Sequence, residues 1–235
     1  MKRLLLGLAV LLAAPVMAAP VKKAVPVRRS APVNWINVVA PTPDGGMRMG
    51  NPKAPVKLVE YGSRACPYCA RFGAEGVPAL KAGYIATGKV SYEFRDFPVH
   101  GPLDLGPILL GWCVGPARFF TVLDQMFANQ PTLLAREEEV SAKVQARTGA
   151  TPNQVAIAYA EGLGYIAFMK ARGLPEPKAR ACLNDRRGID RIVAMTRAAT
   201  TKYNVSSTPT FLINGNPTGA SDWASLEPLL RAAGG

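Results

Sequence analysis

The sequence predicts an α/β fold in which a block of helices interrupts a strand–helix–strand unit, and three observations carry this prediction. A valine-rich apolar segment at 54–63 precedes a helical segment and then an alternating segment at 89–97. From 102 to about 203, apolar residues recur at steps of three and four, as they do in amphipathic helices. Strand character returns at 208–215, where the pair Asn214-Gly215 indicates a tight hairpin turn.

The first strand–helix–strand unit is predicted from its boundaries and its periodicity. Pro55 and Gly62 bound the first strand, and Pro67 suits the first turn of the next helix, where a missing N–H costs nothing. Three residues predict a bend in that helix: Gly73, Gly76 and Pro78. The second strand alternates Val90, Tyr92 and Phe94 with Ser91, Glu93 and Arg95. We expect the two strands to be parallel, with a right-handed connection.

The helical block and the last elements are marked by prolines and a capping residue. Prolines fall where helices are expected to begin or end: Pro116, Pro131 and Pro152. Three aromatic residues are interpreted as core of the helical block: Phe119, Phe120 and Phe127. After the hairpin turn, Pro217 restricts the second strand to a short piece or an edge. Asp222 or Ser221 is expected to cap a final helix that runs to about Leu230.

The N-terminus has the pattern of a secretory signal peptide over residues 1–18. Lys2 and Arg3 precede a short apolar run, and Val16-Met17-Ala18 is a plausible cleavage site. The run is shorter than the roughly 20 residues of a membrane helix, and an uncleaved anchor is the alternative. We therefore expect an exported protein. Residues 19–50 hold five prolines and a net charge of +4, which predicts an extended, mobile segment.

Charge and composition limit the function classes, and the order of predicted elements gives the domain layout. The chain has 235 residues and a formal net charge of +12, but beyond residue 50 its basic residues are scattered, so we expect no nucleic-acid partner. Its 49% hydrophobic content supports a folded core. The predicted layout places the first half of the α/β unit at 51–101, the helical insertion at 102–195 and the second half at 196–235.

The segment "CPYC" at 66–69 holds the residues most suited to chemistry. A structural disulfide at this spacing would close a tiny loop and stabilise little. A zinc site needs about four ligands, but the other candidates, Cys113, Cys182 and His100, are distant in sequence. A c-type haem needs a histidine after the second cysteine, where Ala70 stands. Redox exchange is the favoured interpretation, with no cofactor and no metal.

A redox pair needs one cysteine that is a thiolate and one that resolves the mixed disulfide. Cys66 stands at a predicted helix start, where backbone N–H groups and the helix dipole favour an anion. Arg64 and Arg71 are expected to add positive potential. Cys69 lies within the first turn and is expected to be less exposed than Cys66.

Residues 54–233 resemble the DsbA-like family of exported thiol:disulfide oxidoreductases. The segments that carry the resemblance are "CPYCARF", "FRDFPVHG", "WCVGPARFFTVLDQMFANQ", "ACL" and "VSSTPTFLING". The resemblance implies a thioredoxin fold with an inserted all-helical domain. It also implies a cis peptide bond between Thr208 and Pro209, facing the cysteine pair, although X-Pro statistics alone favour trans.

The resemblance assigns roles to three further residues. Glu60, six residues before Cys66, matches the buried acid of the family, which would relay a proton to or from Cys69; an exposed strand position is the alternative. Cys113 and Cys182 would form a second disulfide, and two buried free thiols are the alternative. His100, the only histidine, is interpreted as incidental, although it could lie close enough to tune Cys66.

The family implies a periplasmic enzyme that oxidises reduced, cysteine-containing exported proteins and is reoxidised by a DsbB-like membrane partner. Two features depart from its strongest oxidants, because Pro67-Tyr68 replaces Pro-His and Thr208 replaces Val. Both departures resemble DsbG-type reductases and isomerases, which is the alternative function. However, residues 19–50 are too short and proline-rich for the N-terminal dimerisation domain of those proteins. A non-enzymatic exported chaperone that binds peptides is a further alternative.

Overall fold

A computed structural model describes residues 33–235 of the chain. The predicted signal peptide at 1–18 and residues 19–32 of the basic segment lie outside the described residues. Within the described part, no helix has the length and apolar character required to cross a membrane.

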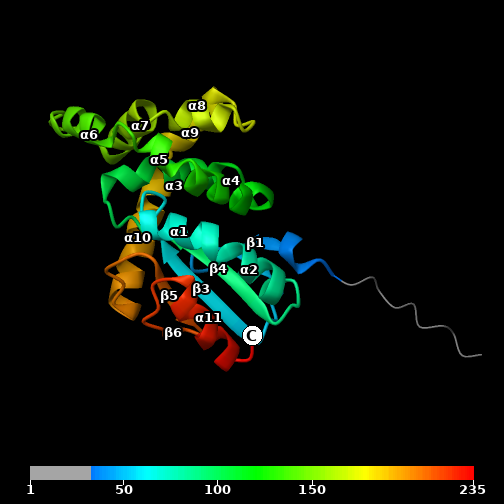
Figure 1. The fold of residues 1–235 in the computed structure, drawn as a ribbon. Helices are drawn as coiled ribbons and strands as arrows, with labels where there is room; N and C mark the ends of the chain where they lie inside the picture. Colours follow the sequence, from blue (N-terminus) through cyan, green and yellow to red (C-terminus); the bar gives the residue numbers. More distant parts are fainter. Residues whose placement is uncertain (1–32) are drawn as a thin grey trace, which may run out of the picture. The chain divides into compact units, whose positions relative to one another are not determined.

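A six-stranded mixed sheet forms the centre of this part of the chain, in the order β1-β2-β4-β3-β5-β6 (Figure 1). The strands are β1 (Val39–Pro41), β2 (Met47–Gly50), β3 (Val56–Gly62), β4 (Val90–Asp96), β5 (Thr210–Ile213) and β6 (Asn216–Pro217). Only β3 and β4 are parallel, and the other neighbours pair antiparallel. The predicted parallel unit over 54–97 is therefore confirmed.

Helices connect the strands in two groups. The first group joins β3 to β4 and contains α1 (Pro67–Glu75), α2 (Val77–Leu80) and the π-helix η2 (Lys81–Ile85). The second follows β4 and contains α3 (Pro102–Cys113), α4 (Pro116–Ala128), α5 (Gln130–Leu133), α6 (Glu137–Gln145), α7 (Pro152–Gly162), α8 (Tyr165–Lys170), α9 (Glu176–Leu183) and α10 (Arg186–Tyr203). A short 3-10 helix, η1 (Trp35–Asn37), precedes β1, and α11 (Trp223–Ala232) follows β6.

The predicted bend between α1 and α2 falls at Gly76. This glycine separates the two helices, and its backbone N–H still donates to the carbonyl of Phe72 at 2.8 Å. A Cβ at Gly76 would lie 2.6 Å from the Phe72 ring. The position therefore needs a residue without a side chain, because Phe72 is packed into the core beneath it.

The prediction that residues 19–50 are extended and mobile is wrong from residue 35 onward. Residues 39–41 and 47–50 are β1 and β2, and β2 pairs with the central strand β4. Met47 and Met49 are buried while Arg48 between them is not, the alternation of a strand with one face on the core. Pro41 is tolerated because β1 is an edge strand.

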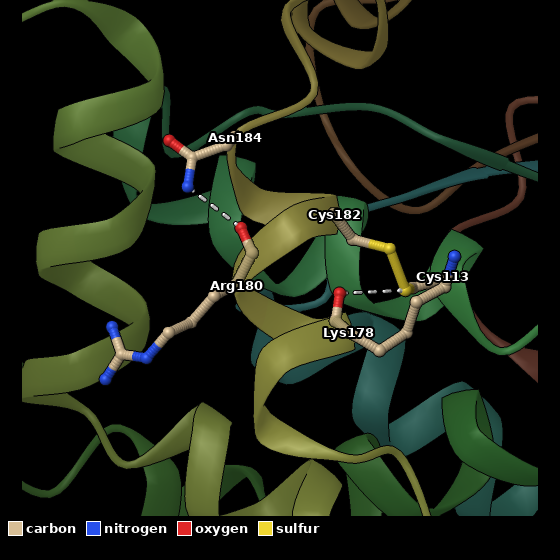
Figure 2. Close-up of a disulfide and its surroundings, with 5 residues drawn as sticks. All are labelled: Cys113, Lys178, Arg180, Cys182 and Asn184. Carbon is tan, nitrogen blue, oxygen red and sulfur yellow. Dashed lines mark hydrogen bonds between the residues drawn. A yellow bond between two sulfur atoms is a disulfide. The ribbon is translucent and has the colours of Figure 1, made fainter.

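The helical block has its own apolar core and one disulfide. Buried residues of α3, α6, α7, α8 and α9 form one cluster with Ala65. Cys113 at the end of α3 is bonded to Cys182 in α9, as Figure 2 shows, so the disulfide implied by the resemblance is present in this structure. The predicted domain boundary at residue 195 falls inside α10, which is one continuous helix from Arg186 to Tyr203.

The prediction that the aromatic residues of α4 belong to the core of the helical block is wrong. Phe119, Phe120 and Phe127 pack with the apolar cluster of the sheet, and their rings lie 5.6 to 6.3 Å from those of Tyr92 and Phe94. Helix α4 therefore covers the sheet and links it to the remaining helices (Figure 1). Aromatic residues at helical spacing indicate a buried face, but they do not identify the element that covers it.

The last elements match their predictions. Asn214 and Gly215 both have positive φ angles, 51° and 84°, in the turn between β5 and β6. The Asn214 side chain also accepts a hydrogen bond from the backbone N–H of Lys57 at 2.8 Å, which ties the turn to β3. Pro217 lies in the two-residue edge strand β6. Asp222 caps α11 through a hydrogen bond from the backbone N–H of Ser225.

Candidate active site

Cys66 and Cys69 lie at the start of α1, directly after the carboxyl end of β3. Cys66 is the N-cap residue and Pro67 is the first helical residue, as predicted. Both cysteines are free thiols in this structure. Cys66 keeps 4% of its surface exposed and Cys69 keeps none, so an incoming sulfur atom reaches Cys66 first.

The surroundings of Cys66 favour its thiolate. Hydrogen bonding from the Cys69 thiol is the largest cause that lowers the pKa of Cys66 to about 5, against the opposing effect of burial. The backbone N–H groups of Cys69 and Tyr68 lower it further. The N-terminus of a helix supplies such N–H groups because they have no partner within the helix.

Cys69 has the opposite environment. Burial raises its pKa well above the ordinary value, and the hydrogen bond that it donates to Cys66 raises it further. In the pH range in which Glu60 is ionised, its negative charge adds to this effect. At neutral pH the reduced pair therefore holds a thiolate at Cys66 and a thiol at Cys69, which is the arrangement that thiol–disulfide exchange needs.

Glu60 is fully buried in β3, so the alternative of an exposed strand position is wrong. Burial raises its pKa from 4.5 to about 8, while a hydrogen bond from the Tyr92 hydroxyl to Glu60 Oε2 acts in the opposite direction. The other carboxyl oxygen, Oε1, is buried and has no hydrogen-bond partner among residues 33–235. Glu60 is therefore largely protonated at neutral pH, with one oxygen fixed by Tyr92 and the other free.

Gly62 leaves the space that the free oxygen occupies. A Cβ at this position would collide with the Phe94 ring and would lie 2.9 Å from Glu60 Oε1. The strand thus carries an acid at residue 60 and no side chain at residue 62, on the same face of the sheet. Any larger residue at 62 would displace either the acid or the aromatic ring.

The peptide bond between Thr208 and Pro209 is cis, as the resemblance implied. Cys66 Sγ lies 3.3 Å from the Thr208 carbonyl oxygen, which accepts a hydrogen bond from Cys66 in its protonated form, so this loop lies against the cysteine pair. Strand β5 begins two residues later at Thr210 and pairs with β3. The sheet therefore fixes the loop and the cysteines relative to each other.

A residue of the helical block holds the backbone immediately before α1. The Gln130 side chain donates to the carbonyl oxygens of Arg64 and Cys66, at 3.0 and 3.1 Å. Gln130 is buried in α5, so these carbonyl groups have a partner that water cannot replace. The helical block thus fixes the loop that carries the reactive cysteine.

A second polar cluster holds the other side of this loop. The Ser63 hydroxyl donates to Asp104 Oδ1 at 2.8 Å and accepts from the backbone N–H of Ala65 at 3.1 Å. The His100 backbone N–H donates to Asp104 Oδ2, and His100 Nδ1 lies 3.1 Å from Ser63 Oγ. The Asp104 carboxylate, whose Oδ2 lies 3.6 Å from His100 Nδ1, is the main cause that raises the pKa of the His100 ring, and the charge of Cys66 contributes.

Arg64 does not act as the positive neighbour that the sequence suggested. It is fully buried and its guanidinium donates to both carboxyl oxygens of Asp96, at 2.7 and 3.2 Å. Its charge is therefore balanced within the core. Arg71 lies on the exposed side of α1, 5.6 Å from the centre of the Tyr68 ring.

Sequence reasoning missed four residues of the site: Ser63, Tyr92, Asp104 and Gln130. Tyr92 was predicted to lie in a strand, but nothing local indicates that its hydroxyl reaches Glu60 on the neighbouring strand. One signal was available for Asp104, since a carboxylate in the very apolar helix "PLDLGPILLGWC" needs a buried partner.

Comparisons with known proteins agree with this geometry. The chain matches a family described as thioredoxin over residues 42–232. It is 33% identical to a protein-disulfide isomerase from Novosphingobium aromaticivorans, whose crystal structure superimposes with a TM-score of 0.74 over 79% of this chain and 95% of that one. The structure of Wolbachia pipientis α-DsbA1, 23% identical, has the same fold, with a TM-score of 0.63 over 82% of this chain and 92% of that one.

A predicted protein-disulfide oxidoreductase of Rickettsia felis is 28% identical over 184 residues. The match covers 78% of this chain but only 58% of that protein, so the chain spans less than two thirds of the length of such curated relatives. The family match covers every residue from β2 to α11, including the cysteine pair and the cis-proline loop. The chain belongs to the thioredoxin family, and its fold is the DsbA-like form with a helical block inserted between β4 and β5.

Proposed function

We propose that the protein is a thiol:disulfide oxidoreductase that introduces disulfides into exported proteins at Cys66–Cys69. The observation that carries this proposal is the asymmetry of the pair. Cys66 is a stabilised thiolate with some exposure, and Cys69 is a buried thiol beside a protonated acid. A stable Cys66 thiolate makes it a good leaving group, which favours donation of the disulfide to a client.

The reaction begins with the Cys66–Cys69 disulfide. A client thiolate attacks Cys66 Sγ, a client–Cys66 disulfide forms, and Cys69 leaves as a thiolate. A second client thiolate then attacks the client sulfur of this mixed disulfide, and Cys66 leaves as a thiolate. The client loses two electrons and gains a disulfide, and the cysteine pair gains both electrons.

Glu60 supplies the proton for the first step. With a pKa of about 8 it is protonated at neutral pH, and it can give its proton to the Cys69 thiolate as that thiolate forms. The same carboxylate accepts the proton again when the pair is reoxidised. Tyr92 keeps one oxygen of the acid engaged, which leaves Oε1 for this exchange.

Clients are held by backbone pairing and by a neighbouring cleft. The backbone of Thr208 lies before β5 begins, and it can pair with an extended client segment next to Cys66. A cleft of about 720 Å³ adjoins this site and includes Ala65, His100, Leu134, Glu137 and Tyr159. A mixture of apolar and polar groups suits unfolded clients of varied sequence.

The compartment of this activity is the periplasm. The signal-peptide pattern at 1–18 supports export, and a second disulfide between Cys113 and Cys182 fits an oxidising environment. The reduced pair must lose its electrons after each cycle, which requires an oxidant. A DsbB-like membrane protein is the proposed reoxidant.

A reductase or isomerase is the second candidate. Thr208 and Pro67-Tyr68 support it, as does the similarity to the Novosphingobium aromaticivorans protein, which is named a protein-disulfide isomerase. In this case the reduced pair is the working form: the Cys66 thiolate attacks a client disulfide, and the client is either reduced or rearranged.

The reduction potential of Cys66–Cys69 separates the two candidates. The protein is equilibrated with glutathione buffers, and the free thiols are counted after alkylation. We expect a potential well above that of the glutathione couple. A value near or below that of thioredoxin, about −270 mV, would instead make the protein a reductase or isomerase.

A trapping experiment tests whether the protein is an enzyme at all. Cys69→Ser removes the resolving thiol, so mixed disulfides between Cys66 and client proteins should accumulate on non-reducing gels. Cys66→Ser is the matched control and should form none. If Cys66→Ser keeps full function in cells and Cys69→Ser traps nothing, the protein is a non-enzymatic chaperone.

A further inference from the structure

The Cys113–Cys182 disulfide borders a cleft of about 410 Å³. The cleft is formed by α3, α9 and the start of α10, and it includes Trp112, Lys178, Asp185, Arg187 and Arg191. Both cysteines are partly exposed rather than buried. A small molecule in this cleft can therefore reach the sulfur atoms.

Positive charge predominates in this cleft. Lys178, Arg187 and Arg191 are exposed, and within residues 33–235 none of them forms an ion pair. Asp185 is the acidic residue of the lining, and its carboxylate is occupied by the backbone N–H of Arg187 at the start of α10. Three cations against one carboxylate leave a net charge of +2 beside the disulfide.

The two basic side chains of α9, Lys178 and Arg180, differ in whether acidic residues neutralise their charge. Lys178 lines the same cleft as the disulfide, and its backbone carbonyl oxygen lies 3.8 Å from Cys113 Sγ. Figure 2 shows that Arg180 and Asn184 point away from the disulfide. Arg180 is neutralised by ion pairs with Glu161 and Glu176. Within the described residues, the cation of α9 that has no ion pair, Lys178, is thus the one that lines the cleft of the disulfide. Arg191 stacks on Trp112, 3.6 Å from the ring centre, which holds its charge at the same cleft.

We propose that the Cys113–Cys182 disulfide is a second thiol-exchange site, which reacts with small anionic thiols independently of Cys66–Cys69. Two effects of the cations combine here. They raise the local concentration of an anionic thiolate, and they stabilise the cysteine thiolate that leaves when the disulfide is attacked. A disulfide with a purely structural role requires neither of these effects.

The exchange conserves electrons and atoms. A small thiolate attacks one sulfur of the pair, the Cys113–Cys182 bond breaks, and the other cysteine leaves as a thiolate beside the cations. A second small thiolate attacks the small-molecule sulfur of the mixed disulfide and releases the first cysteine as a thiolate. The protein gains two electrons, and two small thiols become one small disulfide. The reverse sequence restores the bond between α3 and α9.

The test compares an anionic and a neutral thiol on the same protein. The full chain carrying Cys66→Ala and Cys69→Ala is treated at low salt with 2-mercaptoethanesulfonate or with 2-mercaptoethanol. Adducts on Cys113 and Cys182 are timed by mass spectrometry, and rates are divided by the thiolate concentration. We expect the anionic thiol to react about threefold to tenfold faster, an advantage that falls with added salt. Peptide mapping on the unsubstituted chain should give the same order.

Substitution of the basic residues then tests whether their charge causes the faster reaction of the anionic thiol. Lys178→Gln with Arg187→Gln should bring the ratio of the two rates close to one. Lys170→Gln with Arg197→Gln removes the same charge from exposed positions outside the cleft and should leave the ratio unchanged. The proposal is overturned if neither thiol reacts with the folded protein, if the ratio is already one, or if the two double substitutions have the same effect. None of these outcomes depends on whether Cys66–Cys69 is an oxidase.

Discussion

Cys66 and Cys69 have opposite acidities although only two residues separate them. The difference comes from position, because residue 66 caps α1 and residue 69 lies inside its first turn, where the sheet core buries it. The hydrogen bond from the Cys69 thiol links the two, since it stabilises one as an anion and keeps the other neutral. The helix start thus gives two identical side chains different protonation states, a thiolate at Cys66 and a thiol at Cys69, as the proposed exchange requires.

Removing the Cys69 thiol should weaken the acidity of Cys66. In Cys69→Ala we expect the Cys66 pKa to rise from about 5 by one unit or more, because its largest stabilising hydrogen bond is lost. The ultraviolet absorbance of the thiolate, followed against pH, measures this shift. Cys69→Ser keeps a donor and should shift the pKa less. Equal pKa values in Cys69→Ala and the reduced unsubstituted protein would contradict the assignment.

Tyr92 should control the acidity of Glu60. In Tyr92→Phe the hydroxyl that stabilises the carboxylate is lost, so the Glu60 pKa should move further above about 8. The chemical shift of the Glu60 carboxyl carbon in NMR spectra recorded across pH measures this value. Tyr84→Phe is the control, since Tyr84 donates to Glu227 on α11 instead. A Glu60 pKa that is unchanged or lower in Tyr92→Phe would exclude this role.

At the scale of single elements, the N-terminal hairpin shows how a short strand becomes part of a core. Strands β1 and β2 extend the sheet beyond β4, and η1 covers the same edge. Between the strands, Gly45 has a φ of 88° and faces Met195 of α10, where a Cβ would lie 2.5 Å from the methionine sulfur. The turn therefore needs glycine both for its backbone angle and for its close approach to α10.

The buried face of β2 should dominate its contribution to stability. Met49→Ala should lower the free energy of unfolding by about 2–3 kcal/mol, because it leaves a cavity beneath the sheet edge. Arg48→Ala, on the other face, should cost less than about 1 kcal/mol. Urea unfolding of both variants tests this. Similar losses for the two residues would show that the strand does not pack as described.

At the scale of the whole molecule, the buried acid opposes folding as pH rises. Between pH 4.5 and about 8 the folded protein keeps the Glu60 proton, while the unfolded chain releases it. The unfolded state is therefore favoured increasingly as pH rises through this window, and the penalty is absent below pH 4.5. An active site that keeps this acid does so at the expense of stability.

Glu60→Gln should remove this dependence. We expect the reduced variant to be more stable than the reduced unsubstituted protein by at most about 3 kcal/mol at neutral pH, with the difference vanishing near pH 4.5. Denaturant unfolding at a series of pH values measures it. A difference that is constant across pH would mean that the substitution acts through packing and not through the proton.

The sequence predicted those parts of the molecule that depend on neighbouring residues. The helix start at Cys66, the turn at Asn214 and the cap at Asp222 are local, and they follow from backbone and capping preferences. The cis bond at Pro209 and the burial of Glu60 came only through the resemblance to a family.

The remaining features depend on contacts between distant segments. Gln130 reaches the carbonyl of Cys66 across 64 positions, and Tyr92 reaches Glu60 across two paired strands. The strand at 47–50 was missed for another reason. Its alternating methionines are a signal of only four residues, and the prolines before it outweighed them in the prediction.

Arg64 makes the helical block inseparable from the sheet. Its guanidinium is bound by Asp96 at the end of β4, and Phe119 of α4 covers it at 5.1 Å. On the α3 side, a Cβ at Gly111 would collide with it. A chain that joined β4 directly to β5 would expose this ion pair and the aromatic rings around it. The inserted helices therefore form part of the core around this ion pair, and grafting them onto another scaffold requires this arginine to be transferred with them.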